Sequence, residues 1–301
     1  MPYETKYIWL DGKFVPFAQA KIHIINHSLH YGSAVFEGIR CYKTAKGSAV
    51  FRLTEHIDRL FHSGAVMGMK IPYKKVEIIK IIKELIRKNK LSECYIRPII
   101  FYGNCMKVDP HGASVHFSII IWPWGKLLNK DSVTVKTSPF IRIHPQSSIM
   151  SAKISGHYVN SSISSMQATK AGYDEALLLD YRGNIAEGPG ENIFFVKKKI
   201  INTPKKGTIL PGITRDSIEK IVIDLGYKFV QKEIKPKDIK NYEEAFFTGT
   251  AAEVNAIGKI DNYKFGQGKE GKAVKEIKEK YIRIIHGEEK KYEKWLSYIN
   301  A

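Results

Sequence analysis

Several stretches of this chain have the length and the alternation of apolar and polar residues that β-strands show. Residues 7–15 form a predicted hairpin that turns at Asp11-Gly12, because glycine tolerates the positive φ of a tight turn. A second hairpin is predicted from residues 176–180 and 185–196, which flank a turn at residues 181–184. Further strands are expected at residues 92–102, 114–122 and 133–137.

Between these strands, apolar residues recur every three or four positions, which is the spacing of an amphipathic helix. Thr54 is a candidate N-cap for a helix that runs through Leu60. Thr214 or Asp216 opens a later helix, and Gly226 ends it. Another helix carries residues 161–171. The other apolar stripes are Ile78, Ile81, Ile82 and Leu85; Ile218, Ile221, Val222 and Leu225; and Val274, Ile277, Tyr281 and Ile284.

The alternation is interrupted at Pro123-Trp124-Gly125 and in the polar run that follows it. We therefore expect a smaller N-terminal domain at residues 1–127, a linker at 128–134 and a larger C-terminal domain at 135–301. A chain of 301 residues is long enough for two cores. Because both halves mix strands and helices, the predicted fold class is α/β or α+β with two domains.

The composition, with 44% hydrophobic residues, is that of a folded globular protein. No apolar run is long enough to cross a bilayer, and the N-terminus has no apolar signal core, so we expect a soluble, cytoplasmic protein. The three cysteines, Cys41, Cys94 and Cys105, suggest small buried residues and no disulfide framework. No metal site is expected, because the histidines at positions 23–30 lack a recognisable ligand motif.

The formal net charge of +18 would suit a nucleic-acid partner if the basic residues were gathered on one face. The lysines are instead spread along the chain, with glutamates between many of them. This dispersion favours a lysine-coated enzyme that attracts anionic substrates, and we expect no nucleic-acid and no membrane partner.

Three features in order along the chain point to one kind of chemistry. Lys153 lies in a stretch of small residues, Glu187 stands 34 residues later beside glycines, and Pro211-Gly212-Ile213-Thr214 precedes a predicted helix. Pyridoxal phosphate needs an amine for its aldehyde, an anion for its ring nitrogen and N–H donors for its phosphate. The sequence therefore indicates a pyridoxal-phosphate enzyme. Arg59 and Thr250 are candidates for further phosphate contacts.

The same residues resemble a known family. Residues 187–194, 201–203 and 210–216 resemble the signature of the class IV aminotransferases, which are fold-type IV pyridoxal-phosphate enzymes. Within the class, residues 30–40, 95–98, 123–125 and 248–253 are most similar to the branched-chain amino acid aminotransferases. The resemblance covers nearly the whole chain and thins after about residue 265. It implies transfer of the amino group between L-leucine, L-isoleucine or L-valine and 2-oxoglutarate.

The resemblance also implies roles for individual residues. Lys153 would carry the covalent link to the cofactor and act as general base and acid. The other cofactor contacts would be Tyr158 at the phenolic oxygen, Glu187 at the ring nitrogen, Leu210 against the ring, and Arg59, Ile213, Thr214 and Thr250 at the phosphate.

On the substrate side, the resemblance implies an apolar pocket formed by Phe36, Gly38, Trp124, Tyr31 and Val108. Tyr31 and Val108 would come from the partner subunit of a homodimer, or of a larger assembly built of dimers. The turn at Thr250 and Ala251 would bind the substrate α-carboxylate, and Tyr95 and Arg97 would accept the distal carboxylate of glutamate.

Three residues depart from the family pattern. Leu127 stands where a tyrosine is common, which affects the polar lining of the pocket; Pro189 replaces a small residue beside Glu187; and nothing in the sequence explains Lys126. D-amino acid aminotransferases and aminodeoxychorismate lyases share the cofactor motifs, although Tyr95-Ile96-Arg97 argues against both. A nucleic-acid-binding protein that retains the motif as a relic is the alternative from another class of function.

Overall fold

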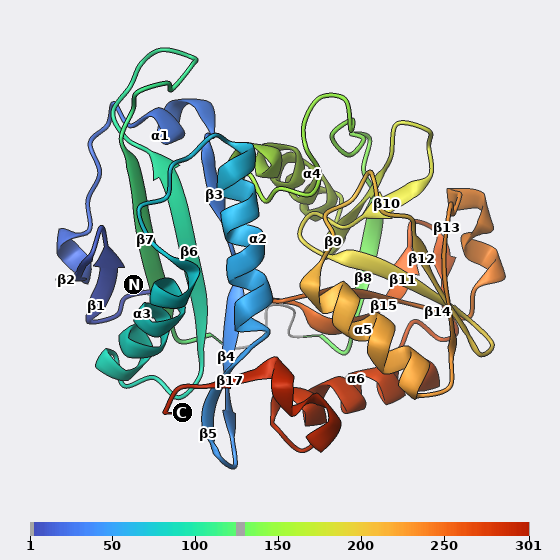
Figure 1. The fold of residues 1–301 in the computed structure, drawn as a ribbon. Helices are drawn as coiled ribbons and strands as arrows, with labels where there is room; N and C mark the ends of the chain where they lie inside the picture. Colours follow the sequence, from blue (N-terminus) through green and yellow to red (C-terminus); the bar gives the residue numbers. More distant parts are fainter. Residues whose placement is uncertain (1–2, 125–129, 301) are drawn as a thin grey trace. The chain divides into compact units, whose positions relative to one another are not determined.

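The computed structural model describes residues 3–124 and 130–300, and the chain forms two compact units (Figure 1). The first comprises Met1–Gly125, Ala152–His157 and Arg283–Ala301, and the second comprises Lys126–Ser151 and Tyr158–Ile282. The division predicted at residues 128–134 stays a prediction. Residues 152–157, which include Lys153, join the first unit although no composition signal marks them.

The first unit is built on an eight-stranded sheet in the order β17-β5-β4-β6-β7-β1-β2, with β3 paired to β6. The predicted hairpin is confirmed as β1 and β2, with Asp11 and Gly12 at positive φ in the turn. The predicted strands at residues 92–102 and 114–122 are confirmed as β6 and β7. The strands are β1 Tyr7–Leu10, β2 Lys13–Pro16, β3 Ala34–Phe36, β4 Ile39–Thr44, β5 Gly47–Phe51, β6 Cys94–Tyr102, β7 Val115–Trp122 and β17 Leu296–Tyr298.

Helices α2 (Leu53–Val66) and α3 (Lys75–Lys88) pack their apolar stripes on this sheet. Helix α3 packs against strands β1 and β7 of this sheet (Figure 1). The predicted cap of α2 is wrong, because the helix begins at Leu53 after Arg52, which has left-handed backbone angles, and Thr54 lies in the first turn. Unit 1 also contains α1 (His27–Tyr31) and 3-10 helices at Phe17–Gln19, Ser155–His157 and Lys290–Trp295.

The second unit contains a sheet in the order β10-β9-β8-β15-β14-β11-β12-β13. An additional pairing between β10 and β11 closes six of these strands into a ring around an apolar core that includes Ile193, Phe195 and Phe247. The strands are β8 Ser132–Thr137, β9 Glu175–Leu179, β10 Ile185–Glu187, β11 Asn192–Lys197, β12 Ile200–Pro204, β13 Lys228–Lys232, β14 Glu244–Gly249, β15 Glu253–Ile260 and β16 Tyr263–Lys264.

The single strand predicted at residues 185–196 is in fact two strands, β10 and β11, separated by a turn at Gly188-Pro189-Gly190. The helices are α4 (Tyr158–Lys170), α5 (Ile213–Asp224), a 3-10 helix at Pro236–Asn241 and α6 (Lys272–Ile285), of which the last three residues are assigned to the first unit. Gly212, and neither Thr214 nor Asp216, is the N-cap of α5. The predicted stripe of α6 is confirmed, since Val274, Ile277, Tyr281 and Ile284 are all buried.

The remaining sequence observations concern residues 126 and 127, membrane helices, metal ligands and cysteines. Lys126 and Leu127 lie outside the described residues. Within residues 3–124 and 130–300, no helix is long and apolar enough to cross a membrane, and no His, Cys, Asp and Glu residues are grouped as metal ligands would be. Cys41 and Cys94 are buried as expected, and Cys105 is half-buried.

Candidate active site

Lys153 is held beside strand β3 by its own backbone. Its N–H donates to Ser63 Oγ at 2.9 Å, and its carbonyl accepts from the Phe36 N–H at 3.1 Å. Val35 and Ile154 add an isolated antiparallel β-bridge. The Nζ of Lys153 lies 5.1 Å from the centre of the Phe36 ring. The lysine is therefore anchored at its backbone, and its side chain extends over the ring of Phe36, a predicted substrate-side residue.

The small residues around Lys153 allow this close approach. The Gly156 N–H donates to the Gly32 carbonyl at 3.0 Å. A Cβ atom on Gly32 would lie 2.8 Å from the Gly156 Cα, and Gly32 has a φ of +64°. Only glycine satisfies both conditions without moving a backbone. The segment from Ser151 to Gly156 is rich in small side chains because its backbone lies close to the end of α1 and to β3.

Arg59 belongs to a buried charged cluster in the first unit. Its Nε donates to Glu37 Oε1 at 2.5 Å and its Nη2 donates to Glu37 Oε2 at 2.9 Å. His56, one turn earlier on α2, contacts Glu37 Oε2 through Nδ1 at 2.7 Å. Side-chain exposure is 0% for Glu37, 2% for His56 and 11% for Arg59. Arg59 is therefore held in place by an acid and a histidine that the sequence pattern did not single out.

The cluster shifts two pKa values. Burial by itself would raise the pKa of Glu37, but the charges and hydrogen bonds of Arg59 and His56 outweigh burial and hold that pKa well below its usual range. Burial lowers the pKa of His56, and the attraction of Glu37 compensates only in part. At neutral pH Glu37 is ionised and His56 is neutral. His56 Nδ1 consequently donates to the carboxylate, since an ionised carboxylate only accepts.

The predicted substrate-side residues of the first unit lie together. The Arg97 guanidinium lies over the rings of Phe36, Tyr95 and Trp122, at 4.7, 5.5 and 6.0 Å from their centres. Trp124 packs on Tyr95 at 5.2 Å between ring centres. Nε of Arg97 is buried without a hydrogen-bond partner, and no carboxylate among the described residues contacts this guanidinium. The result is an aromatic site with an uncompensated cation.

Gly38 makes room for this aromatic group. A Cβ atom at position 38 would lie 1.9 Å from the hydroxyl of Tyr95, so any other residue would displace that tyrosine. The close approach arises because β4 pairs with β6 directly after Gly38.

Tyr31 is the last residue of α1, Val108 lies in the loop between β6 and β7, and His27 contacts both. The Nε2 of His27 contacts the carbonyls of Lys107 and Val108 at 2.9 and 3.2 Å, and its ring centre lies 4.6 Å from that of Tyr31. Tyr31 and Val108 are 43% and 77% exposed. His27 therefore holds the backbone at residues 107 and 108 by hydrogen bonds.

Glu187 lies where the ring of strands in the second unit closes, because it pairs with Asn192 across β10 and β11. Its buried carboxylate accepts from Arg142 Nε at 2.7 Å, from Asn192 Nδ2 at 3.0 Å and from the Leu210 N–H at 3.2 Å. Asn192 Nδ2 also donates to the Leu210 carbonyl at 3.1 Å. The predicted residues Glu187 and Leu210 are thus brought together, with Arg142 and Asn192 as additional partners.

The N-terminus of α5 carries the predicted phosphate contacts of the second unit. Ile213 and Thr214 form its first turn, where backbone N–H groups have no partner within the helix. A Cβ atom on Gly212 would lie 2.1 Å from Asn192 Oδ1, so a glycine is needed where this N-terminus meets the loop of Glu187.

Two further predicted sites of the second unit lie at element ends. Thr250 and Ala251 form the turn between β14 and β15, which lies close to the turn after Glu187, since a Cβ on Gly249 would come 3.2 Å from the Gly190 carbonyl. Tyr158 begins α4. The sequence missed Glu37, His56, Ser63, Arg142 and Asn192. Glu37 and Asn192 lie inside the motifs, and the other three had no local signal.

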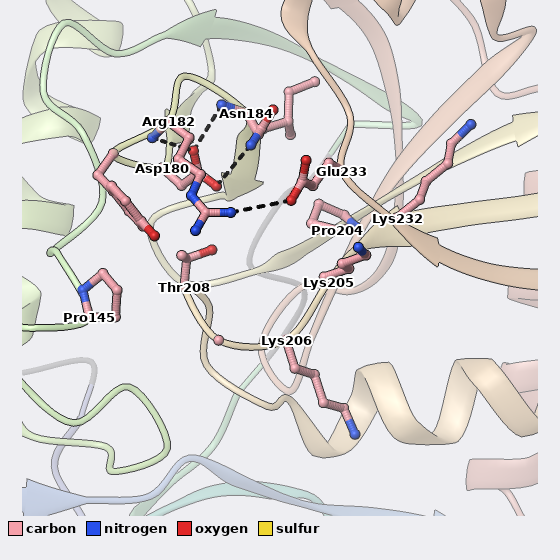
Figure 2. A pocket seen from close by; sticks show the side chains of 13 residues that line it. Pro145, Asp180, Arg182, Asn184, Pro204, Lys205, Lys206, Thr208, Lys232 and Glu233 are labelled. Atoms are coloured by element: carbon pink, nitrogen blue, oxygen red, sulfur yellow. Dashed lines mark hydrogen bonds and ion pairs between the residues drawn. The ribbon is translucent and has the colours of Figure 1, made fainter.

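A separate cavity of about 380 Å³ in the second unit contains none of the predicted residues (Figure 2). Asp180 accepts from the N–H groups of Arg182 and Asn184 at 2.8 and 2.9 Å, and Arg182 pairs with Glu233 at 3.5 Å. Lys205, Lys206 and Lys232 line its other side.

The arrangement in each unit matches a known class of enzyme. The sequence pattern of the amino-transferase class IV family matches residues 34–260. The chain belongs to the class IV aminotransferases, and the predicted fold class is confirmed.

Relatives at 36–41% identity are named branched-chain amino acid aminotransferases. The branched-chain-amino-acid aminotransferase of Pseudomonas aeruginosa is 40% identical over 297 residues, 97% of each chain. The enzyme of that name from Escherichia coli K12 is 36% identical over 304 residues, 99% of this chain and 98% of the relative. A solved T.th. branched-chain amino acid aminotransferase, complexed with N-(5'-phosphopyridoxyl)-L-glutamate, has a TM-score of 0.95 and 41% identity, and the match covers 98% of this chain and 99% of that one.

Proposed function

We propose that this chain is a pyridoxal-phosphate-dependent transaminase that transfers the amino group between L-leucine, L-isoleucine or L-valine and 2-oxoglutarate. Family membership and the names of the relatives support the reaction. The phosphopyridoxyl-glutamate bound by the T.th. enzyme supports the cofactor. Within this chain the observation that carries the proposal is Arg97, a cation among aromatic rings with no carboxylate partner among the described residues.

The described residues fit each part of the cofactor. Lys153 supplies a primary amine on an anchored backbone. Glu187 supplies a buried carboxylate for the ring nitrogen. The N-terminus of α5, with the N–H groups of Ile213 and Thr214, supplies donors for the phosphate. Arg59 adds a charged donor, Thr250 a hydroxyl, Leu210 an apolar contact for the ring and Tyr158 a partner for the phenolic oxygen.

The chemistry of the chain centres on one proton at Lys153 Nζ. When bound, the cofactor supplies an electron-poor ring that stabilises negative charge at the substrate α-carbon. The Nζ of Lys153 takes the α-carbon proton as general base and returns a proton as general acid. The contacts with Ser63 and Phe36 fix the lysine backbone, which limits where Nζ moves. The same groups act in reverse with the second substrate, so the kinetics should be ping-pong.

Two classes of substrate fit the aromatic site. The rings of Phe36, Tyr95 and Trp124 give an apolar surface for a branched aliphatic side chain, which needs no polar partner. The Arg97 guanidinium gives a partner to the distal carboxylate of glutamate or 2-oxoglutarate. The turn at Thr250 and Ala251 binds the α-carboxylate, which both substrates share.

A homodimer is part of the proposal. Tyr31 and Val108 are exposed yet held in place, Tyr31 by a hydrogen bond from its hydroxyl to the Met106 carbonyl at 3.1 Å and Val108 through His27. Such residues are suited to reach into the substrate pocket of a partner subunit. Light scattering in solution should give twice the mass of one chain, or an even multiple of it. We also propose a cytoplasmic location.

The decisive test is activity with defined donors. The purified protein should be yellow and should convert L-leucine and 2-oxoglutarate to the corresponding oxo acid and glutamate. A panel of L- and D-amino donors separates the related activities, because D-alanine as the better donor would indicate a D-amino acid aminotransferase. Absence of transfer from any branched-chain L-amino acid would overturn the proposal.

A further inference from the structure

Glu37 is an acid at a place where a phosphate is proposed to bind. It follows β3 directly, and its fully buried carboxylate accepts four N–H donors. Two come from Arg59, one comes from His56 Nδ1 and the fourth is the Gly38 N–H at 3.3 Å. Three of these donors reach Oε2 and one reaches Oε1, so both carboxylate oxygens are engaged.

Electrostatics alone would not place an acid there. A buried carboxylate near a bound phosphate repels it, and a buried ion pair rarely adds stability over apolar residues of the same volume. The pairing with Arg59 is nevertheless close and uses both carboxylate oxygens. The pairing of Glu37 with Arg59 must therefore have a role other than stabilising the fold or attracting the phosphate.

That role is orientation. Glu37 engages two of the five N–H groups of the Arg59 guanidinium, Nε and one at Nη2, which fixes the plane of the fork. A free arginine side chain would lose rotamer entropy on binding an anion, and a fork held in advance loses less. His56 lies three residues before Arg59 on α2 and holds Glu37 Oε2 from the side, so the carboxylate cannot rotate with the arginine.

We propose that Glu37 is a positioning residue that orients the Arg59 guanidinium for the cofactor phosphate, with His56 locking the carboxylate. This inference rests on the proposed function, since it requires that the chain binds pyridoxal phosphate through Arg59. It assigns Glu37 and His56 no contact with the substrate.

The test compares two ligands that differ only in the phosphate. Full-length enzyme is freed of cofactor, and the dissociation constants for pyridoxal phosphate and for pyridoxal are measured by fluorescence titration. Glu37→Gln should weaken pyridoxal phosphate binding about 10- to 100-fold, the range for misplacing one hydrogen-bonded charge. Binding of pyridoxal should stay within about twofold. Asp58→Asn is the matched control, because Asp58 precedes Arg59 on α2 but pairs with Lys75 at the exposed surface.

A double-mutant cycle separates orientation from a general effect on the fold. If Glu37 acts through Arg59, Glu37→Gln should cost nothing further in an Arg59→Ala background. If Glu37→Gln does not fold, Glu37→Asp is used, which keeps the charge and shortens the reach. Equal weakening of pyridoxal and pyridoxal phosphate, an unchanged constant for pyridoxal phosphate, or a full additional loss in the Arg59→Ala background would each overturn the positioning role.

The same data separate this inference from the proposed function. Wild-type enzyme that binds no pyridoxal phosphate would overturn both. If Arg59→Ala binds pyridoxal phosphate as tightly as the wild-type enzyme does, Arg59 does not contact the phosphate and Glu37 cannot act through it. The transaminase proposal would still stand. Weak binding by Arg59→Ala with normal binding by Glu37→Gln would overturn only the role of Glu37.

Discussion

Replacing Arg97 should affect one substrate and spare the other. In the structure its guanidinium lies over three rings, and its buried Nε has no hydrogen-bond partner among the described residues. When leucine fills the pocket, no carboxylate faces this cation. When 2-oxoglutarate binds, its distal carboxylate gains charge-assisted hydrogen bonds worth about 1.5–3 kcal/mol. Since about 1.4 kcal/mol is tenfold in affinity, Arg97→Met should raise KM for 2-oxoglutarate about 10- to 150-fold.

The effect on stability has to be separated from this selectivity. Each cation–π contact contributes about 0.5–1 kcal/mol, so losing three lowers the unfolding free energy by roughly 1.5–3 kcal/mol whichever substrate is present. The matched control is Arg40→Met, because Arg40 lies on the neighbouring strand β4, is buried, and covers the Tyr42 ring at 4.8 Å. It should lose stability without selectivity.

The assay measures the two half-reactions separately, with L-leucine and with 2-oxoglutarate. We expect the KM for L-leucine to change less than about threefold in Arg97→Met, because one apolar contact at most is lost. Arg97→Lys should fall between wild type and Arg97→Met, since an ammonium keeps the charge but not the fork. An equal rise of KM for both substrates, or the same selective loss in Arg40→Met, would refute substrate recognition by Arg97.

Four further outcomes are expected. Lys153→Ala should lower turnover by about 10²- to 10⁴-fold and remove the visible absorbance, and near-normal turnover would exclude its role as general base. Thr250→Ala should lose cofactor faster than wild type on dialysis, with unchanged thermal unfolding of the cofactor-free protein; equal retention would take Thr250 out of the phosphate site. Gly38→Ala should destabilise by about 1–3 kcal/mol and lower kcat/KM, because the new Cβ would lie 1.9 Å from the Tyr95 hydroxyl; wild-type values for both would contradict the packing. Burial lowers the pKa of His56 below its unfolded value of about 6.5. The contribution of neutral His56 to the free energy of unfolding is therefore complete above about pH 6.5. It decreases as pH falls below this value, by up to about 1.4 kcal/mol per pH unit. Urea unfolding from pH 7 to 5 should therefore show a shallower decline for His56→Gln, and identical slopes would argue against it.

The sequence determined the elements whose signal is local. The spacing of Ile78, Ile82 and Leu85 predicts α3, and Asp11-Gly12 predicts the first hairpin, because one buried face or one turn dipeptide is enough to specify each. The order of Lys153, Glu187 and the segment before α5 likewise indicates the cofactor, since three different chemical needs are met in one chain.

Element ends required more than local pattern. Residues 185–196 are predicted as one strand although Gly188-Pro189-Gly190 interrupts them, and Glu187 ends β10 where its pairing with Asn192 closes the ring of strands. Arg52 and Gly212, and not the expected hydroxyl or carboxylate residues, precede α2 and α5. A cap is chosen by how the chain enters the helix, and that path is set by packing.

Only the tertiary structure decided which partners hold the reactive groups. Ser63 contacts Lys153 across 90 residues, Arg142 contacts Glu187 across 45 and Glu37 contacts Arg59 across 22. The periodicity of apolar residues predicts which side chains are buried, but it does not predict which residues they contact. Because a buried charge must find a partner, these pairings are fixed only when the elements pack.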